Sequence, residues 1–357
     1  IVEEGQGPLS RVRCDETRGW WQRLEVIEDR RSETLRFIAT TDRARAEETL
    51  ATGQLRLADD FIRQAAQSSG ANAEVAKTLF EMLLPNRLKE LAPRQANLVL
   101  LVDDASARYP WELLEDRWSH GSRPPAIAAG LVRQLKTPRF RAHPAHATDA
   151  TAFVVGNPDL SGWDRFGDLP GAREEARKVA ARLNAGGYRT LECIDAKADA
   201  ILSGLHRNAW RILHLAGHGE HEFALDATSA ASRRVSGMVI GMNTFLTPGD
   251  VEQMRWVPEL VFINCCHLGR TLGATAAQGR FNLLAANLAV QFIEMGVKAV
   301  VAAGWAVDDG AAEAFAESFY GHLLEGEPFG EAVRAAREEI WVRFPDANTW
   351  GAYQCYG

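Results

Sequence analysis

From residue 149 onward the sequence alternates short apolar runs with longer segments whose apolar residues recur at helical spacing. The run TAFVVGNP at 151–158 is almost wholly apolar and ends in a turn, which is typical of a strand buried on both faces. The segment 169–187 has a helical stripe and stops at two glycines. We expect further strands at 188–194, 210–217, 259–266 and 297–305, helices at 198–208 and 280–296 with two more after the last strand, a hairpin over 236–247, and a final apolar piece at 350–357. This alternation predicts an α/β fold, a mostly parallel sheet with helices on both faces, whose functional groups lie at the carboxyl ends of the strands.

The overall composition limits which functions are open to the chain. Its 357 residues allow two or more domains, and its net charge of −7 argues against binding to nucleic acid, whose phosphates need a basic face. The uncharged apolar runs are well short of the roughly 20 residues that a membrane helix needs, and no signal peptide is visible. Five cysteines at irregular spacing suit a reducing compartment better than a disulfide framework. We therefore expect a cytoplasmic protein that contacts neither nucleic acid nor membrane.

The residues before 149 fall into two parts. The segment 97–117 holds an apolar run followed by a short amphipathic helix, and the polar, proline-punctuated stretch 139–150 is typical of a linker. The first seventy residues predict a hairpin over 22–29 and 33–40 and a long polar helix around 42–68. These elements make a poor domain alone, so we expect 1–71 to be the truncated end of a larger unit, followed by lobes at 72–148 and 149–357.

Two of the predicted strand ends carry residues that can perform covalent chemistry. His218 follows the strand at 210–217, and Cys266 ends the strand at 259–266, a separation of 48 residues (266 − 218). A thiol nucleophile needs a base that is its neighbour in space, and a histidine about 50 residues before the cysteine is the spacing of caspase-type proteases. The amides of Gly219 and Cys266 could then stabilise an oxyanion. His218 and Cys266 are therefore the candidate catalytic pair.

Six motifs resemble, in order along the chain, the CHAT family of bacterial caspase-like cysteine proteases, which includes relatives of separase. They are LLVDDASARYPWELL, LPGAREE, HLAGHG, CCHLG, VVAAGWAVDDGAAEAFAESFYGHLLEG and TWGAYQCYG, within about Leu84 to Gly357. By motif position, the family's histidine falls on His218 and its cysteine on Cys266. The resemblance implies a degenerate caspase-like lobe at 72–148 packed on a catalytic lobe at 149–357, no cofactor, and a role in defence or cell-death signalling.

The resemblance also implies a substrate pocket at the ends of three strands. Its walls would be the turn at Asn157–Asp159, which supplies Asp159, together with Asn264 and Asp308. Separase-like members place an acid near Asp308 to hold a substrate arginine, whereas the aspartate that metacaspases have two residues before the cysteine is Asn264 here. A basic P1 residue is thus favoured but not required. Asp308 and Asp309 could instead open a helix, where carboxylates complement the dipole.

A zinc site is the main chemical alternative for the same segments. His214, His218, Cys265, Cys266 and His267 offer imidazole and thiolate ligands. Adjacent residues on a strand point to opposite faces, however, so the two neighbouring cysteines do not readily share one ion. We therefore expect no bound metal. The remaining members of these segments are expected in structural positions: core for His214, Cys265 and Trp305, and loops for His221 and His267.

The function expected from these features is a cysteine endopeptidase that cleaves a protein substrate with the His218–Cys266 dyad. A non-catalytic caspase-like interaction module is the competing interpretation, and the presence of both dyad residues argues against it. CHAT modules usually form the effector end of longer proteins, so we expect an upstream sensor region or an activating partner. The glycine-containing segment 269–280 is then the loop whose ordering switches a latent chain to an active one.

Overall fold

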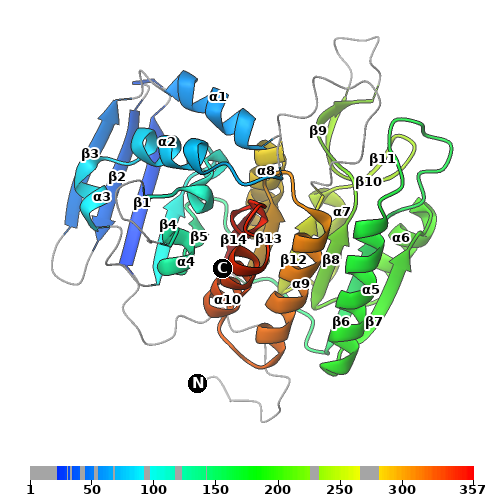
Figure 1. Ribbon diagram of the computed structural model, residues 1–357. Coiled ribbons are helices and arrows are strands. Elements are labelled where there is room, and N and C mark those ends of the chain that lie inside the picture. Colours follow the sequence, from blue (N-terminus) through cyan, green and yellow to red (C-terminus); the bar gives the residue numbers. More distant parts are fainter. Residues whose placement is uncertain are drawn as a thin grey trace.

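The computed structural model describes residues 22–29, 31–32, 34–40, 45–51, 55–66, 69–91, 97–116, 123–141, 143–225, 233–265 and 281–357. Its centre is an eleven-stranded sheet between two layers of helices (Figure 1). In spatial order the strands are β3 (Arg45–Ala51), β2 (Thr34–Thr40), β1 (Gln22–Asp29), β4 (Leu98–Val102), β5 (Val132–Leu135), β14 (Tyr353–Tyr356), β13 (Ala299–Ala303), β12 (Leu260–Asn264), β8 (Ile212–Ala216), β6 (Thr151–Gly156) and β7 (Arg189–Ile194). The pairs β3–β2, β2–β1 and β14–β13 are antiparallel and the other neighbours are parallel. The predicted mostly parallel α/β sheet is therefore confirmed.

The strands β6, β8, β12 and β13 are buried along their whole length. Their sequences are nearly continuous apolar runs because helices cover both faces and leave no solvent side for polar residues. Aromatic side chains fill the space between strands and helices. Phe262 on β12, for example, lies with its ring centroid 5.7 Å from that of Tyr320 and 5.5 Å from that of Tyr353. The core around these strands thus lies where the apolar runs predict it.

The helices lie in two layers. In Figure 1, α5 (Pro170–Ala185), α9 (Asp309–Leu324) and α10 (Phe329–Arg343) stand side by side in front of the sheet, and α8 (Phe281–Glu294) lies behind it. Helix α5 begins at Pro170, whose fixed φ suits a first turn, and ends before Gly187 with its φ of 84°. The other described α-helices are α1 (Leu55–Ala66), α2 (Ala73–Leu83), α3 (Asn86–Leu91), α4 (Pro125–Ala128), α6 (Ala198–Leu205) and α7 (Pro248–Glu252). Within the described ranges, none of the helices has the length and apolar character needed to cross a bilayer.

A small second sheet follows β8 directly. It consists of β9 (Gly219–Ala224), β10 (Arg234–Gly241) and β11 (Thr244–Leu246), with β10 in the middle and antiparallel to both neighbours. The predicted hairpin over 236–247 is confirmed as β10–β11. Figure 1 shows this sheet beyond the end of the main sheet at which β8 stops. It therefore adjoins the edge where functional groups are expected.

The N-terminal region agrees with the sequence expectation in part. β1 and β2 form the predicted hairpin, but the long helix expected around 42–68 is wrong in its first part, because 45–51 form strand β3 and α1 starts only at Leu55. The segment 45–51 is polar and has no apolar stripe, so pairing with the edge of β2 decides its structure. After β4 the chain forms two 3₁₀ turns, η2 (Ser106–Arg108) and η3 (Trp111–Leu113), in place of the expected α-helix. Pro110 between them lacks the backbone donor that a continuous helix needs.

A buried ion pair lies where the two halves of the sheet meet. Arg133 on β5 donates from Nε to Oε1 of Glu112 at 2.7 Å, and from one terminal nitrogen to the Tyr356 hydroxyl of β14 at 3.3 Å. Arg337 on α10 lies 3.7 Å from the same carboxylate, and the three charged side chains are fully buried. The sheet continues across residues 71 and 148, since β1 pairs with β4 and β5 with β14. The division into domains at 1–71, 72–148 and 149–357 stays a prediction.

Candidate active site

His218 lies just beyond the carboxyl end of β8 and is held by the loop that follows β6. Its Nε2 is 2.7 Å from the carbonyl oxygen of Gly167, and its ring centroid is 5.0 Å from that of Phe166. A carbonyl oxygen only accepts hydrogen bonds, so Nε2 carries the proton and the neutral ring has its lone pair on Nδ1. The side chain is 6% exposed. The loop therefore orients the imidazole with Nε2 towards the Gly167 carbonyl.

The end of β12 lies against the residue that follows His218. β8 and β12 are parallel, with Ala216 paired to Asn264. A Cβ atom added at Gly219 would lie 2.7 Å from both the Cβ and the carbonyl oxygen of Cys265, so the backbones approach as closely as glycine allows. Cys266 and His267 fall outside the described residues, as does the segment 269–280. The structure thus places His218 and Gly219 at the predicted edge, next to the last described residue before Cys266.

Cys265 is a core residue, as predicted from the alternation of strand side chains. It is 2% exposed. Burial, and after it the charge of Glu175, raises the pKa of the Cys265 thiol far above its ordinary value. A thiol that stays protonated is a poor nucleophile. Burial therefore makes Cys265 a poor candidate for the nucleophile.

A chain of buried polar groups lies beneath the two strand ends. Asn264 donates from Nδ2 to Oε2 of Glu175 on α5 at 2.6 Å. The other carboxylate oxygen of Glu175 is 3.3 Å from Nε2 of His214 on β8, and Nδ1 of His214 is 3.3 Å from the Tyr320 hydroxyl on α9. All four side chains are buried, and His214, Asn264 and Tyr320 are fully inaccessible. The core position expected for His214 is confirmed.

Sequence reasoning missed Glu175. The signal was its place on α5, one position before Ala176 and three after Ala172, on the stripe that faces the sheet. An acidic residue on an apolar stripe needs a buried partner. The partners, on β8, β12 and α9, are distant in the sequence, so their identity could not be deduced from α5 alone.

A cavity of about 480 Å³ opens at the loop between β6 and α5, which also holds His218. Phe166 and Gly167, which contact His218, also line it, and so do the predicted pocket residue Asp159 and the neighbouring Asp164. The further lining residues are Asn157, Pro158, Leu160, Ser161, Gly162, Trp163, Asp168, Arg173 and Asp195. Asn264 and Asp308 are not among the described residues that line it. Of the three predicted pocket residues, one therefore borders this cavity.

One wall of the cavity is a network of hydrogen bonds and ion pairs. Asn157 donates from Nδ2 to Asp168 and Asp195, both at 2.7 Å, and accepts the Leu169 amide at 2.9 Å. Arg173 donates from Nε to both carboxylate oxygens of Asp195, at 2.9 and 2.8 Å, and from Nη2 to Asp168 at 2.5 Å. The hydrogen bonds from Asn157 and Arg173 lower the pKa of Asp168. The positive charge of Arg173 is thus neutralised inside the wall.

Asp308 begins α9. Its Oδ1 accepts the amide of Ala311 at 2.9 Å, and its own amide donates to Oγ1 of Thr349 at 3.1 Å. Asp308 thus caps the start of a helix, which was one of the two roles that the sequence allowed. A role of Asp308 in a substrate pocket stays a prediction. Trp305 is fully buried and donates from Nε1 to the Gly351 carbonyl at 3.2 Å, which confirms its expected core position.

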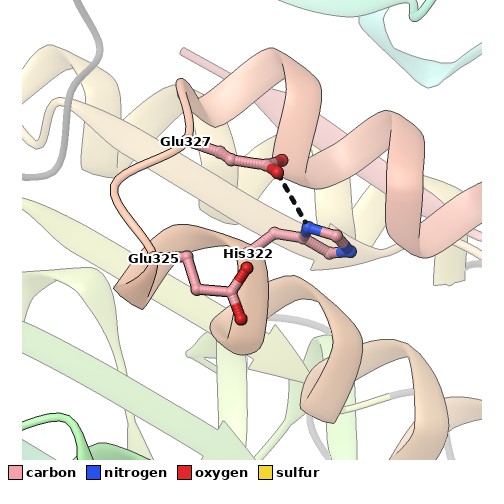
Figure 2. Close-up of side chains that lie close together, drawn as sticks. All are labelled: His322, Glu325 and Glu327. Atoms are coloured by element: carbon pink, nitrogen blue, oxygen red, sulfur yellow. Dashed lines mark ion pairs between the residues drawn. The ribbon is translucent and has the colours of Figure 1, made fainter.

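Two further histidines among the described residues contact groups outside the predicted dyad. His221 lies on β9, so its assignment to a loop is wrong; its Nδ1 is 3.3 Å from the Ser236 hydroxyl that the adjacent strand β10 presents. Among described residues, His322, Glu325 and Glu327 form the one group whose potential ligand atoms all lie within 4.8 Å of one another. Figure 2 shows this group at the end of α9, with Nδ1 of His322 ion-paired to Glu327 at 3.1 Å. His322 and Glu327 are partly exposed, and Glu325 is exposed.

Comparison with known proteins identifies the family. A CHAT domain model matches residues 73–357, and the chain belongs to the CHAT domain family. The matched solved structures include the Arg-specific cysteine proteinase gingipain R, at 12% identity and a TM-score of 0.43 over 85% of this chain and 74% of that chain. A complex of the Porphyromonas gingivalis RgpB pro- and mature domains matches with the same identity and TM-score, over 85% and 76% of the two chains. The comparison with curated protein sequences gave no match. The family predicted from the motifs is confirmed.

Proposed function

We propose that the chain is a cysteine endopeptidase whose catalytic dyad is His218 and Cys266. The observation that carries the proposal is the register of β8 on β12, in which Ala216 is paired with Asn264. His218 stands two residues after Ala216, and Cys266 stands two residues after Asn264. Two further observations support it: Cys265, the direct neighbour of Cys266, contacts the backbone of Gly219, and the imidazole is already oriented by Gly167.

The chemistry follows from the tautomer of His218. Nδ1 takes the thiol proton of Cys266, and the sulfur attacks the carbonyl carbon of the peptide bond, whose oxygen becomes negative. The amides of Gly219 and Cys266 donate to that oxygen. The C–N bond then breaks as the imidazolium gives its proton to the leaving amine. Water then attacks the resulting thioester. Nδ1 of His218 takes a proton from that water and passes it to the sulfur, and the carboxyl product leaves.

The substrate we propose is a protein whose side chain before the cleaved bond is basic. The cavity formed by the loop that holds His218 is lined by Asp159 and Asp164, and its arginine is neutralised by two other aspartates. An acidic lining favours lysine or arginine over acidic side chains. Asn264 is buried against Glu175, so it is not expected to contact a substrate. The proposed preference for basic side chains therefore depends on the lining of the cavity.

We further propose that an upstream sensor region or a partner protein activates the chain, and that the protein works in the cytoplasm. Family membership supports the first of these points, since the matched domain starts at residue 73 and further sequence precedes it. The free, buried thiols of Cys193, Cys265 and Cys355 suit a reducing compartment.

The deciding experiment measures cleavage of a peptide library, with each residue type at P1, by the chain and three variants. Cys266→Ala and His218→Ala should abolish turnover, and the matched control Cys265→Ala should retain most of it. The cleaved peptides should have lysine or arginine at P1, and turnover should rise when the upstream region or partner is supplied. Activity in Cys266→Ala together with loss of activity in Cys265→Ala would make the assigned nucleophile wrong. Absence of turnover under every condition would refute the proposed function.

A further inference from the structure

We propose that Glu175 is a positioning residue that fixes the geometry of the His218–Cys266 dyad; this inference rests on the function proposed above. Glu175 lies on α5, and its side chain is 1% exposed. One carboxylate oxygen accepts the 2.6 Å hydrogen bond from Asn264, and the other is 3.3 Å from Nε2 of His214. A single side chain thus contacts both β12 and β8.

Both contacts of Glu175 involve residues that stand shortly before the dyad residues in the sequence. Asn264 is the last residue of β12 and stands two positions before Cys266. His214 lies on β8, four positions before His218. At roughly 3.3 Å per residue, these separations correspond to about 7 and 13 Å of extended chain. A shift of either strand end relative to the other therefore changes the distance between imidazole and sulfur.

The donors and acceptors around Glu175 form a consistent chain. A carboxylate only accepts, and Asn264 Nδ2 only donates. Nε2 of His214 lies 3.3 Å from the second oxygen, at ion-pair distance but not hydrogen-bonded to it. Nδ1 of His214 is 3.3 Å from the Tyr320 hydroxyl, which can donate to it. Burial and the charge of Glu175 both raise the pKa of the Tyr320 hydroxyl, which keeps the proton on that donor. Groups on β12, β8 and α9 are thereby oriented by one carboxylate.

Packing alone does not account for an acid at this position. The neighbouring stripe residues Ala172, Ala176 and Val179 are apolar and fully buried. A buried charge gains little stability over an apolar residue of similar volume, so a leucine or methionine at position 175 would serve packing at least as well. What such a residue could not do is hold Asn264 and His214 in fixed orientations. We therefore attribute the carboxylate to the positioning of the two strand ends.

The test compares wild type with Glu175→Met, which keeps the volume but removes both contacts, and Glu175→Gln, which keeps an acceptor for Asn264. Glu174→Ala is the matched control, because Glu174 is the adjacent residue and is half exposed. The pH dependence of Cys266 alkylation by iodoacetamide is followed by mass spectrometry on the intact chain. Turnover is measured with the best peptide of the library, and circular dichroism verifies folding.

In wild type and Glu174→Ala, alkylation of Cys266 should have its midpoint below the roughly 8.5 of a free thiol. Glu175→Met should raise the midpoint towards that value and lower kcat about 100-fold, the effect of a misplacement of about 1 Å, while KM changes less than twofold. Glu175→Gln should recover kcat to within about tenfold of wild type, since its amide oxygen still accepts from Asn264. Asn264→Leu removes the same hydrogen bond from the side of β12 and should act in the same direction.

Folded Glu175→Met or Asn264→Leu with the wild-type midpoint and kcat would overturn the inference while leaving the proposed function intact. If neither variant folds, Glu175 has a structural role and the inference is also overturned. A wild-type chain with an ordinary midpoint and no turnover would instead refute the proposed function, and the inference with it. The two failures are therefore distinguishable.

Discussion

Glu112→Gln should lower the free energy of unfolding by about 3–5 kcal/mol, because it breaks a buried ion pair by removing one partner. Glu112 and Arg133 are both fully buried, and Arg337 lies 3.7 Å from the same carboxylate. Burial disfavours the charge of Arg133, but the charges of Glu112 and Tyr356 and the hydrogen bonds to both together outweigh it and raise the pKa of the guanidinium. A guanidinium stays protonated even without a partner, so two cations remain in the core when the carboxylate is lost. Glutamine has nearly the volume of glutamate, so the substitution isolates the charge from the packing.

Urea unfolding followed by circular dichroism gives the midpoint and slope needed for this comparison. The matched control is Glu338→Gln, which removes the partly exposed ion pair with Arg123 and should cost less than about 1 kcal/mol. The double variant Glu112→Leu/Arg133→Met should be more stable than Glu112→Gln, because it removes one of the two cations together with the carboxylate. A free energy of unfolding for Glu112→Gln within 1 kcal/mol of wild type, on the scale of that control, would refute the reasoning.

Two further predictions concern the candidate site. Gly219→Ala should lower kcat about 100-fold and the free energy of unfolding by about 1–3 kcal/mol, because its Cβ would lie 2.7 Å from Cys265. The control is Gly249→Ala, in which the nearest neighbour of the new Cβ would be 3.5 Å away. It should behave like wild type in the same peptide-cleavage and unfolding assays. Asp168→Asn should lower the melting temperature more at pH 7 than at pH 3. The hydrogen bonds from Asn157 and Arg173 hold the folded pKa of Asp168 below its ordinary value, so the stabilisation by the carboxylate is fully present above the unfolded pKa and is lost as the pH falls through the folded pKa. An equal loss at both pH values would show that the network does not depend on this charge.

The central strands could be predicted from the sequence because burial on both faces is visible at every position of β6, β8, β12 and β13. The candidate base His218 could be found for the same reason, since it directly follows such a run. The edge strand β3 could not, because its residues face solvent and only pairing with β2 selects an extended conformation.

Contacts between distant segments could not be predicted either. β14 lies between β5 and β13, so the C-terminal residues close the sheet next to Arg133. Nothing local in the sequence of the strand specifies these neighbours. The same holds for Glu175, whose place on an apolar stripe signals a buried partner without saying that the partners are Asn264 and His214.

Helix α5 links the two parts of the candidate site through its first two turns. Arg173 holds Asp168 and Asp195 in the wall of the cavity, and two residues later Glu175 holds the ends of β12 and β8. Between them the spacing is set by the helix, at roughly 1.5 Å of rise per residue, rather than by a loop. Gly171 fixes the start of the same helix against α9, since a Cβ there would lie 2.6 Å from the carboxylate carbon of Asp309. The proposed endopeptidase needs the substrate side chain and the attacking sulfur at a constant separation, and a short rigid segment that contacts both the cavity and the strand ends would provide it.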